Sequence, residues 1–202
     1  MKAELLQIFR RRYACHRFLP EQPPTEADLD FILEAGRLSP SSFGLEQWKF
    51  VVVRNAAEKL ALQAACFDQT QVGSAGALIV ILAKIADLAP DSTYVKHLLA
   101  REYPGEQLGF ALDNYRNFHA GTDVAAWSVS QCHIAAANML TAATATGLDS
   151  CAIGGFIPEQ VAEVLGVDLA RHRIALLLAL GRCDEHAPEK QRLPLAELVE
   201  YR

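Results

Sequence analysis

Apolar positions recur along this chain with two different spacings, which predict different elements. Residues 2–12 and 25–35 place apolar side chains three or four positions apart, the spacing of one helix face. Thr25 and Asp28 form a capping pair that predicts where the second of these helices begins. The nearly unbroken apolar runs 48–53, 77–83 and 173–180 are typical of strands buried on both faces, with a shorter extended segment at 151–156.

The longest helical pattern runs from residue 123 to residue 146 and ends before Gly147, a plausible C-cap. It is rich in alanine, so we expect it in the core or at a subunit interface. Pro158 opens another helix at its first position. Residues 86–120 are more polar and predict short helices within a mobile excursion. Because helices outnumber the few central strands, the pattern predicts a helix-rich α+β fold in one domain, residues 1–202.

Composition narrows the class of protein. The 202 residues include 24 acidic and 19 basic ones, and the net charge of -5 argues against general binding of nucleic acids or anionic membranes. No apolar run approaches the roughly 20 residues of a membrane span, and the start resembles no signal peptide. We therefore expect a soluble cytoplasmic protein. The five cysteines are odd in number and lack a C-x-x-C pair, which predicts reduced thiols; the scattered histidines predict no metal site.

Basic residues gather in two short segments, one near each end of the chain. Arg10, Arg11, Arg12 and Arg17 lie near the N-terminus, and the segment Lys190-Gln191-Arg192 lies near the C-terminus. One interpretation is a solvated helix end, where cations favour the helix dipole. The other is an anion site formed by both ends, and hydroxyls in the Ser39–Ser42 loop would suit a phosphate attached to a polyol. No dinucleotide fingerprint, P-loop or nucleophile elbow is present.

Five segments, in order, give the chain a resemblance to the FMN-dependent nitroreductase family. They are Arg12-Tyr13-Ala14-Cys15-His16-Arg17-Phe18, residues 39–50, Phe67-Asp68-Gln69-Thr70-Gln71-Val72, residues 147–156, and Lys190-Gln191-Arg192-Leu193-Pro194. The resemblance spans nearly the whole chain. It implies a central, mostly antiparallel sheet and an intertwined homodimer with shared active sites. It also implies bound FMN, with NADH or NADPH as hydride donor.

The resemblance also assigns roles to individual residues. Arg12, Lys190 and Arg192 would hold the FMN phosphate. Ser41 and Ser42, from the partner subunit, would line the ribityl chain and ring. Asp68 and Gln71 would face the pyrimidine edge of the flavin. One flavin face would be covered by the segment Ala152, Ile153, Gly154 and Gly155, while Tyr13 and Ala14 would contact the cofactor through their backbone.

Four positions depart from the family pattern. His16 stands where Lys or Arg is common near the flavin N1/O2 edge, which brings pH dependence into the redox potential. Ala152 and Gly154 replace a common Pro and Glu. Asp68 replaces Asn and, while ionised, cannot donate a hydrogen bond.

The function implied by the resemblance is ping-pong hydride transfer through flavin N5 from NAD(P)H to an electron-poor acceptor, such as a nitroaromatic or a quinone. The proton would come from solvent or from His16. Phe118 is either a core residue or a substrate contact in the variable middle region. Cys151 is interpreted as a packing residue. Two alternatives remain: an FMN carrier or sensor without turnover, and a thiol-dependent redox enzyme using Cys15 or Cys151.

Overall fold

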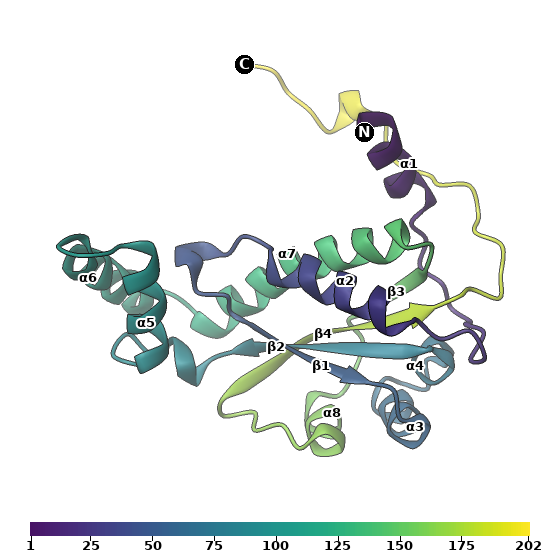
Figure 1. Ribbon diagram of the computed structural model, residues 1–202, viewed down its shortest axis with the longest axis horizontal. Coiled ribbons are helices and arrows are strands. Elements are labelled where there is room, and N and C mark those ends of the chain that lie inside the picture. The colour runs from purple at the N-terminus through teal and green to yellow at the C-terminus, as the bar shows by residue number, and fades with distance from the viewer.

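A four-stranded, fully antiparallel sheet lies at the centre of the molecule, in the order β1-β2-β4-β3 (Figure 1). The computed structural model describes all residues from Met1 to Arg202. The strands are β1 (Trp48–Val53), β2 (Ala77–Lys84), β3 (Asp149–Ile153) and β4 (His172–Gly181). The helix-rich α+β fold with an antiparallel sheet that the sequence predicts is confirmed.

Helices cover both faces of this sheet. On one face lie α2 (Glu26–Arg37) and α7 (Val124–Ala145), and beside α7 lies α1 (Lys2–Arg11). The other face is covered by α3 (Ala56–Ala65), α4 (Thr70–Ser74) and α8 (Pro158–Leu165). At one end of the sheet, α5 (Thr93–Glu102) and α6 (Gln107–Ala120) form a separate helical layer (Figure 1). Short 3-10 turns are η1 (Ser42–Gly44), η2 (Ala86–Leu88) and η3 (Leu195–Glu197).

The two central strands are buried on both faces, as their apolar runs predict. Along β2, Ile79 and Ile81 pack in the cluster beneath α2 and α7, whereas Leu78 and Val80 pack in the cluster beneath α3 and α8. Because successive side chains of a strand point to opposite faces, both faces must be apolar where helices cover both.

The prediction that residues 48–53 are buried on both faces is wrong. Strand β1 is an edge strand that pairs only with β2. Lys49 is exposed, and Val52 is 37% exposed. An apolar run shows that a strand has a covered face, but its place in the sheet depends on partners that are distant in sequence.

Predicted helix boundaries agree with the structure. Thr25 and Asp28 form a reciprocal capping box, and the side chain of Asp123 accepts a hydrogen bond from Ala126 N at 3.0 Å. Gly147 adopts a φ of +86° just after the last turn of α7. Pro158 occupies the first turn of α8. None of the helices has the length and apolar character needed to cross a bilayer.

The polar region 86–120 forms two packed helices. Tyr115 on α6 is fully buried and donates a hydrogen bond to Leu88 O at 2.6 Å. Phe43, from the 39–44 loop, packs against it with 5.2 Å between ring centroids. This aromatic packing joins the helical layer to the loop that carries Ser41 and Ser42.

The prediction of five reduced thiols is wrong for two of them. Cys15 and Cys183 form a disulfide with a Cα–Cα distance of 5.8 Å, whereas Cys66, Cys132 and Cys151 are free and buried. The two partners are 168 positions apart. Their pairing follows from the course of the chain after β4, which local spacing of cysteines cannot show.

Candidate functional site

Short backbone ladders bring the two ends of the chain together at one edge of the sheet. Residues 17–19 run beside residues 182–184, with hydrogen bonds from Leu19 N to Arg182 O and from Asp184 N to Arg17 O, both 2.9 Å. Ala14 forms a parallel bridge to Ser150 in β3. The N-terminal basic segment is thereby fixed between β3 and the chain that follows β4.

This arrangement forms a cationic cavity of about 460 Å³ between the two ends. Its charged lining is five cations and one acid: Arg10, Arg11, Arg12, Lys190, Arg192 and Glu189. None of these cations makes an ion pair within the chain, in contrast to Arg17, which pairs with Asp184 at 3.0 Å. Like charges held together without counterions favour binding of an anion.

Lys190 joins the C-terminal segment to the end of α1. Its Nζ donates hydrogen bonds to Phe9 O and Arg12 O, both at 2.6 Å, and so satisfies carbonyls at the helix end. An ammonium has three donors, so one remains for a ligand. Burial, followed by the charges of Arg12 and Arg192, lowers the pKa of Lys190. An anion in the cavity would offset both of these charge effects.

The predicted flavin-ring segments also lie together. Gln69 Nε2 donates to Gly155 O at 2.8 Å, and Gln71 Nε2 donates to Gln69 Oε1 at 3.1 Å. These contacts join the 67–72 segment to the loop after β3. Asp68 is exposed and adopts a φ of +55°, next to Phe67 at +57°. Two consecutive non-glycine residues in the left-handed region are strained, a feature often found at binding sites.

The loop after β3 presents backbone and open space. Ala152 is exposed, whereas the side chain of Ile153 is 1% exposed and points into the core, so only its backbone is available to a ligand. A Cβ built on Gly154 would have no neighbour within 4 Å. A flat ring system could therefore approach the backbone of this loop closely.

Strand β3 connects the ring segments to the cationic cavity. Ala14 pairs with Ser150 in β3, and Gln69 donates to Gly155 O just after it, so the two parts of the predicted site meet around this strand. Burial raises the pKa of the Cys151 thiol in β3, and the charge of Arg12 acts against that rise with a smaller effect.

His16 and Tyr13 meet at the carboxylate of Glu185. His16 N donates to Glu185 Oε1 at 2.5 Å, and this bond is the main cause of the lowered pKa of Glu185. The pKa of Tyr13 is raised, first by burial and then by the charge of Glu185. The imidazole of His16 is exposed, so its backbone supports the site while its side chain is free to face a ligand.

Ser41, Ser42 and Phe118 lie away from these residues in the same chain. Ser41 Oγ accepts from Glu46 N, and Ser42 N donates to Gln131 Oε1 of α7, both at 2.9 Å. α1 lies against Thr144 and Ala145, near the far end of α7. The 13 positions between Gln131 and Thr144 span roughly 20 Å of helix. One chain cannot bring both serines to the cationic cavity.

Phe118 packs inside the aromatic cluster, 5.0 Å from Trp127 and 5.2 Å from Phe43 between ring centroids. The neighbouring cavity, of about 520 Å³, is lined by Phe43, Tyr103, Gln107, Phe110, Ala111 and Asn114, without Phe118. Phe110 is 73% exposed. If the α5–α6 layer contacts a substrate, Phe110 is better placed than Phe118.

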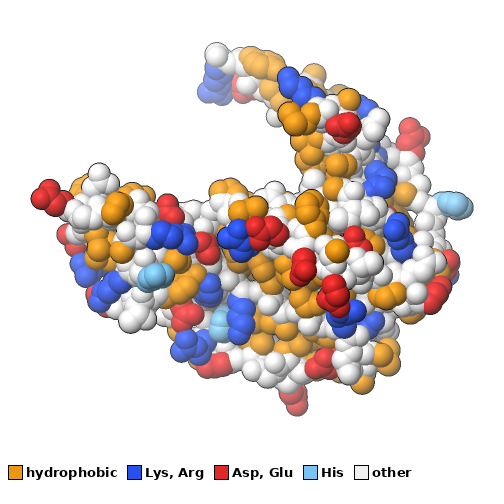
Figure 2. All heavy atoms as spheres, in the orientation of Figure 1, with side chains coloured by type: hydrophobic (Ala, Val, Ile, Leu, Met, Phe, Trp, Pro, Cys, Tyr) orange, Lys and Arg blue, Asp and Glu red, His pale blue; other side chains and the backbone are white.

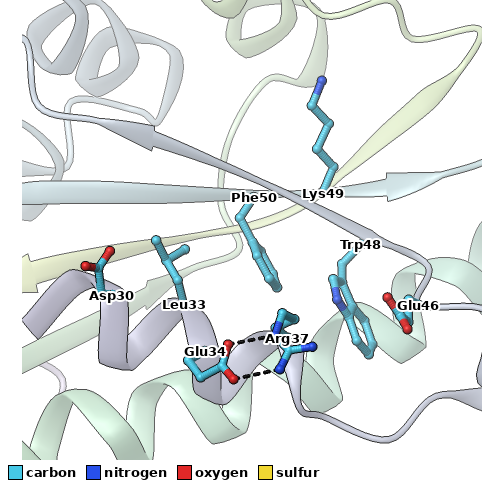
Figure 3. A pocket seen from close by; sticks show the side chains of 8 residues that line it. All are labelled: Asp30, Leu33, Glu34, Arg37, Glu46, Trp48, Lys49 and Phe50. Atoms are coloured by element: carbon cyan, nitrogen blue, oxygen red, sulfur yellow. Dashed lines mark hydrogen bonds and ion pairs between the residues drawn. The ribbon is translucent and has the colours of Figure 1, made fainter. Parts of the chain in front are cut away.

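A further cavity, of about 720 Å³, lies between α2 and β1 (Figure 3). Trp48 and Phe50 stack there with 6.4 Å between centroids, and Arg37 pairs with Glu34 at 2.6 Å. Asp30, Glu34 and Glu46 leave it an excess of acid over base. That charge is unfavourable for a phosphate, which distinguishes it from the cavity between the chain ends.

Residues 9–182 match the model of the Nitroreductase family. The chain belongs to the nitroreductase family. It is 33% identical to a protein of Staphylococcus haemolyticus, provisionally named an NAD(P)H nitroreductase, with 100% of this chain and 98% of that protein covered.

Solved structures show the same fold. A provisionally named nitroreductase from Bacillus subtilis has a TM-score of 0.86 at 23% identity, with both chains covered completely. Another, from Exiguobacterium sibiricum, was solved in complex with FMN; it has a TM-score of 0.81 at 20% identity, with 98% of this chain and 97% of that one covered.

Several residues of the candidate site are absent from the set that the resemblance implies. Arg10 and Arg11, which one interpretation of the sequence places at a solvated helix end, both line the cationic cavity. Gln69 holds the loop after β3, and Glu185 anchors the residues around His16. The adjacency of Arg10 and Arg11 to Arg12 was a usable signal for the first two. Nothing local in the sequence marks Gln69 or Glu185.

Replacing Cys151 by alanine is expected to leave catalysis within about twofold of the wild type, because a buried thiol of raised pKa is a poor nucleophile. Its side chain is only 5% exposed, and burial is the main cause of the raised pKa. NAD(P)H oxidation by the Cys151→Ala variant, with FMN content measured in the same sample, checks this. Lost turnover with FMN still bound would instead support a thiol-dependent mechanism.

Proposed function

We propose that this nitroreductase is an FMN-dependent NAD(P)H oxidoreductase, with residues 1–202 as one flavin-binding domain. The observation that carries the proposal is the cationic cavity, in which both chain ends supply unpaired cations beside the joined ring segments. FMN has a phosphate of roughly two negative charges and a flat ring system. The charged cavity suits the phosphate, and the open backbone at Gly154 suits the ring system.

Each part of the site has a distinct task in this proposal. Arg12, Lys190 and Arg192 bind the phosphate by charge-assisted hydrogen bonds. Gln71 and Asp68 offer hydrogen-bonding groups to the polar edge of the ring. The backbone of the Ala152–Gly155 loop lies against one face of the flavin ring system and positions it. His16 supplies a group whose protonation can adjust charge near flavin N1 and O2.

When bound, FMN would supply two-electron chemistry, accepting hydride from NAD(P)H and passing it to an electron-poor acceptor such as a nitroaromatic or quinone. The protein contributes binding, orientation and electrostatics. The names of the relatives and the FMN in the Exiguobacterium structure support this choice of donor and cofactor.

The proposal includes a homodimer with shared sites. No residue of α1 is buried, and its apolar residues Leu5, Leu6 and Phe9 are each about half exposed. The C-terminal segment beside it exposes further apolar side chains, so together they form an apolar arm that projects from the body (Figure 2). A second copy would cover this surface. Its Ser41 and Ser42 would then lie beside the cationic cavity that the chain ends of the first copy form.

Steady-state kinetics test the reaction. With a quinone or nitroaromatic as acceptor, double-reciprocal plots at several acceptor concentrations are expected to be parallel, because donor and acceptor use one site in turn. Intersecting lines would contradict the ping-pong order. Bound FMN that NAD(P)H cannot reduce would favour a carrier or sensor, the alternative suggested by the departures at His16, Asp68 and Gly154.

Replacing Phe110 by alanine is expected to raise KM for an aromatic acceptor by about tenfold, since an aromatic contact of roughly 1–1.5 kcal/mol would be lost. FMN affinity should stay unchanged, because α6 lies outside the cationic cavity. Leu60→Ala is a matched control, as Leu60 is 62% exposed on α3. An unchanged KM in Phe110→Ala would remove the α5–α6 layer from the substrate site.

A further inference from the structure

The disulfide between Cys15 and Cys183 joins the two segments that form the cationic cavity. Arg12 lies three residues before Cys15, and Lys190 lies seven residues after Cys183. Cys15 N also donates to Ser150 O in β3 at 3.2 Å. The bond therefore ties the start of the C-terminal segment to a part of the chain that the sheet holds in place.

Beyond this bond, backbone hydrogen bonds fix only the first residues of the C-terminal segment, from Cys183 N to Asp149 Oδ2 at 3.0 Å and from Asp184 N to Arg17 O at 2.9 Å. The Arg17–Asp184 pair is at the surface, with side chains 62% and 47% exposed, and such pairs contribute little. Glu185 accepts from His16 N, and Lys190 donates to the end of α1. Every residue from 191 to 202 is exposed, so no core packing within the chain anchors this segment.

We propose that Cys15–Cys183 is a redox-active disulfide that controls how firmly the C-terminal segment closes on the phosphate of the cofactor. Here the bond is placed where its loss would loosen the attachment of the segment that carries Lys190 and Arg192, while leaving both central strands and the two sheet-covering layers intact. The effect on FMN rests on the proposed function, whereas the effect of the disulfide on the C-terminal segment does not.

The chemistry is thiol–disulfide exchange with a dithiol reductant. Cys183 is partly buried and Cys15 fully buried, so the reductant's thiolate attacks Cys183 Sγ. The bond between the two cysteines breaks, and Cys15 leaves as a thiolate that takes a proton. The second thiol of the reductant then displaces Cys183 as a thiol. Two electrons pass to the protein, and the reductant ends as a disulfide.

Glu185 slows thiol–disulfide exchange at this bond in both directions, because its negative charge disfavours the departing Cys15 thiolate as well as the thiolates of the reduced protein. Its carboxylate and both sulfur atoms lie within 4.8 Å of one another. A negative charge at that distance disfavours thiolates, so after reduction both groups stay mainly protonated and reoxidise slowly.

The reduced protein is expected to bind FMN with lower affinity than the oxidised protein. If the released segment is docked about one tenth of the time, the apparent Kd for FMN rises about tenfold. Riboflavin, which has no phosphate, should bind equally to both forms. The peptide bonds after Lys190 and Arg192 should also become much more rapidly cleaved by trypsin in the reduced form.

The test compares air-oxidised and dithiothreitol-treated full-length protein, with alkylation followed by mass spectrometry to count thiols. Dithiothreitol should change FMN affinity and trypsin cleavage in the wild type and in Cys132→Ala, a control that removes a distant buried thiol. It should change neither in Cys15→Ala/Cys183→Ala, which should resemble the reduced wild type throughout.

Two results would overturn the proposal: five free thiols in the oxidised protein, or identical trypsin cleavage of the oxidised and reduced forms. Equal FMN affinity of two forms that trypsin distinguishes would also contradict control of the cofactor. If neither form binds FMN, the proposed function fails, and the trypsin comparison alone still decides whether the disulfide holds the segment.

Discussion

Replacing Lys190 and Arg192 together by alanine is expected to weaken FMN binding about 100-fold and riboflavin binding hardly at all. Each charge-assisted hydrogen bond contributes roughly 1.5–3 kcal/mol, and about 1.4 kcal/mol corresponds to a factor of ten. Two lost bonds would give a larger factor, but Arg10, Arg11 and Arg12 remain in the cavity and compensate in part. Fluorescence titration of the apoprotein with each flavin measures both constants.

A second variant separates charge from structure. Lys190 also donates to Phe9 O and Arg12 O, so its removal could loosen the C-terminal segment. Lys190→Gln keeps hydrogen-bond donors but loses the charge, and it should still weaken the binding of FMN more than the binding of riboflavin. The double variant Lys49→Ala/Arg202→Ala removes the same charges outside the cavity and should leave both affinities unchanged. Equal losses for FMN and riboflavin in the Lys190 variants would assign the segment to folding.

Replacing Leu5 and Phe9 by glutamate is expected to produce a monomer that loses FMN. Both side chains are about half exposed on α1, none of whose residues is fully buried within its own chain. Two carboxylates in an apolar interface would lack partners and cost several kcal/mol. Because Ser41 and Ser42 lie at the other end of α7, a monomer should hold only part of each site.

Sedimentation measures the change directly, with the variant expected at the 22.1 kDa of one chain and the wild type at twice that mass. Leu60→Glu, at an exposed apolar position on α3, should remain dimeric and yellow. A wild-type monomer that binds FMN tightly would contradict the shared site, as would a Leu5/Phe9 variant that remains dimeric.

Local features of the sequence were sufficient for the boundaries of several elements. Thr25, Asp123 and Pro158 mark helix starts by bonds or geometry confined to a few residues, and the structure agrees at each. The continuous apolar runs of β2 and β4 likewise indicate a sheet covered on both faces, because side chains that point to either face of these strands are apolar and buried.

Features that depend on distant segments were harder to predict. The edge position of β1 depends on which strands lack a second neighbour. The Cys15–Cys183 bond depends on the chain after β4 returning beside residues 15–19. Family resemblance supplied candidate residues for the site, and the structure brings Arg12 and Lys190 together as that resemblance implies. It could not supply Gln69 or Glu185, whose contacts are specific to this fold's loops.

We expect the chain ends and the loop after β3 to bind FMN together, in a form that NAD(P)H can reduce. An anaerobic absorption spectrum of the purified protein, recorded before and after addition of NADH or NADPH, tests it most directly. We expect a yellow protein with the absorption bands of oxidised flavin, and bleaching of those bands by at least one of the two donors. A colourless protein that also fails to bind added FMN would contradict it.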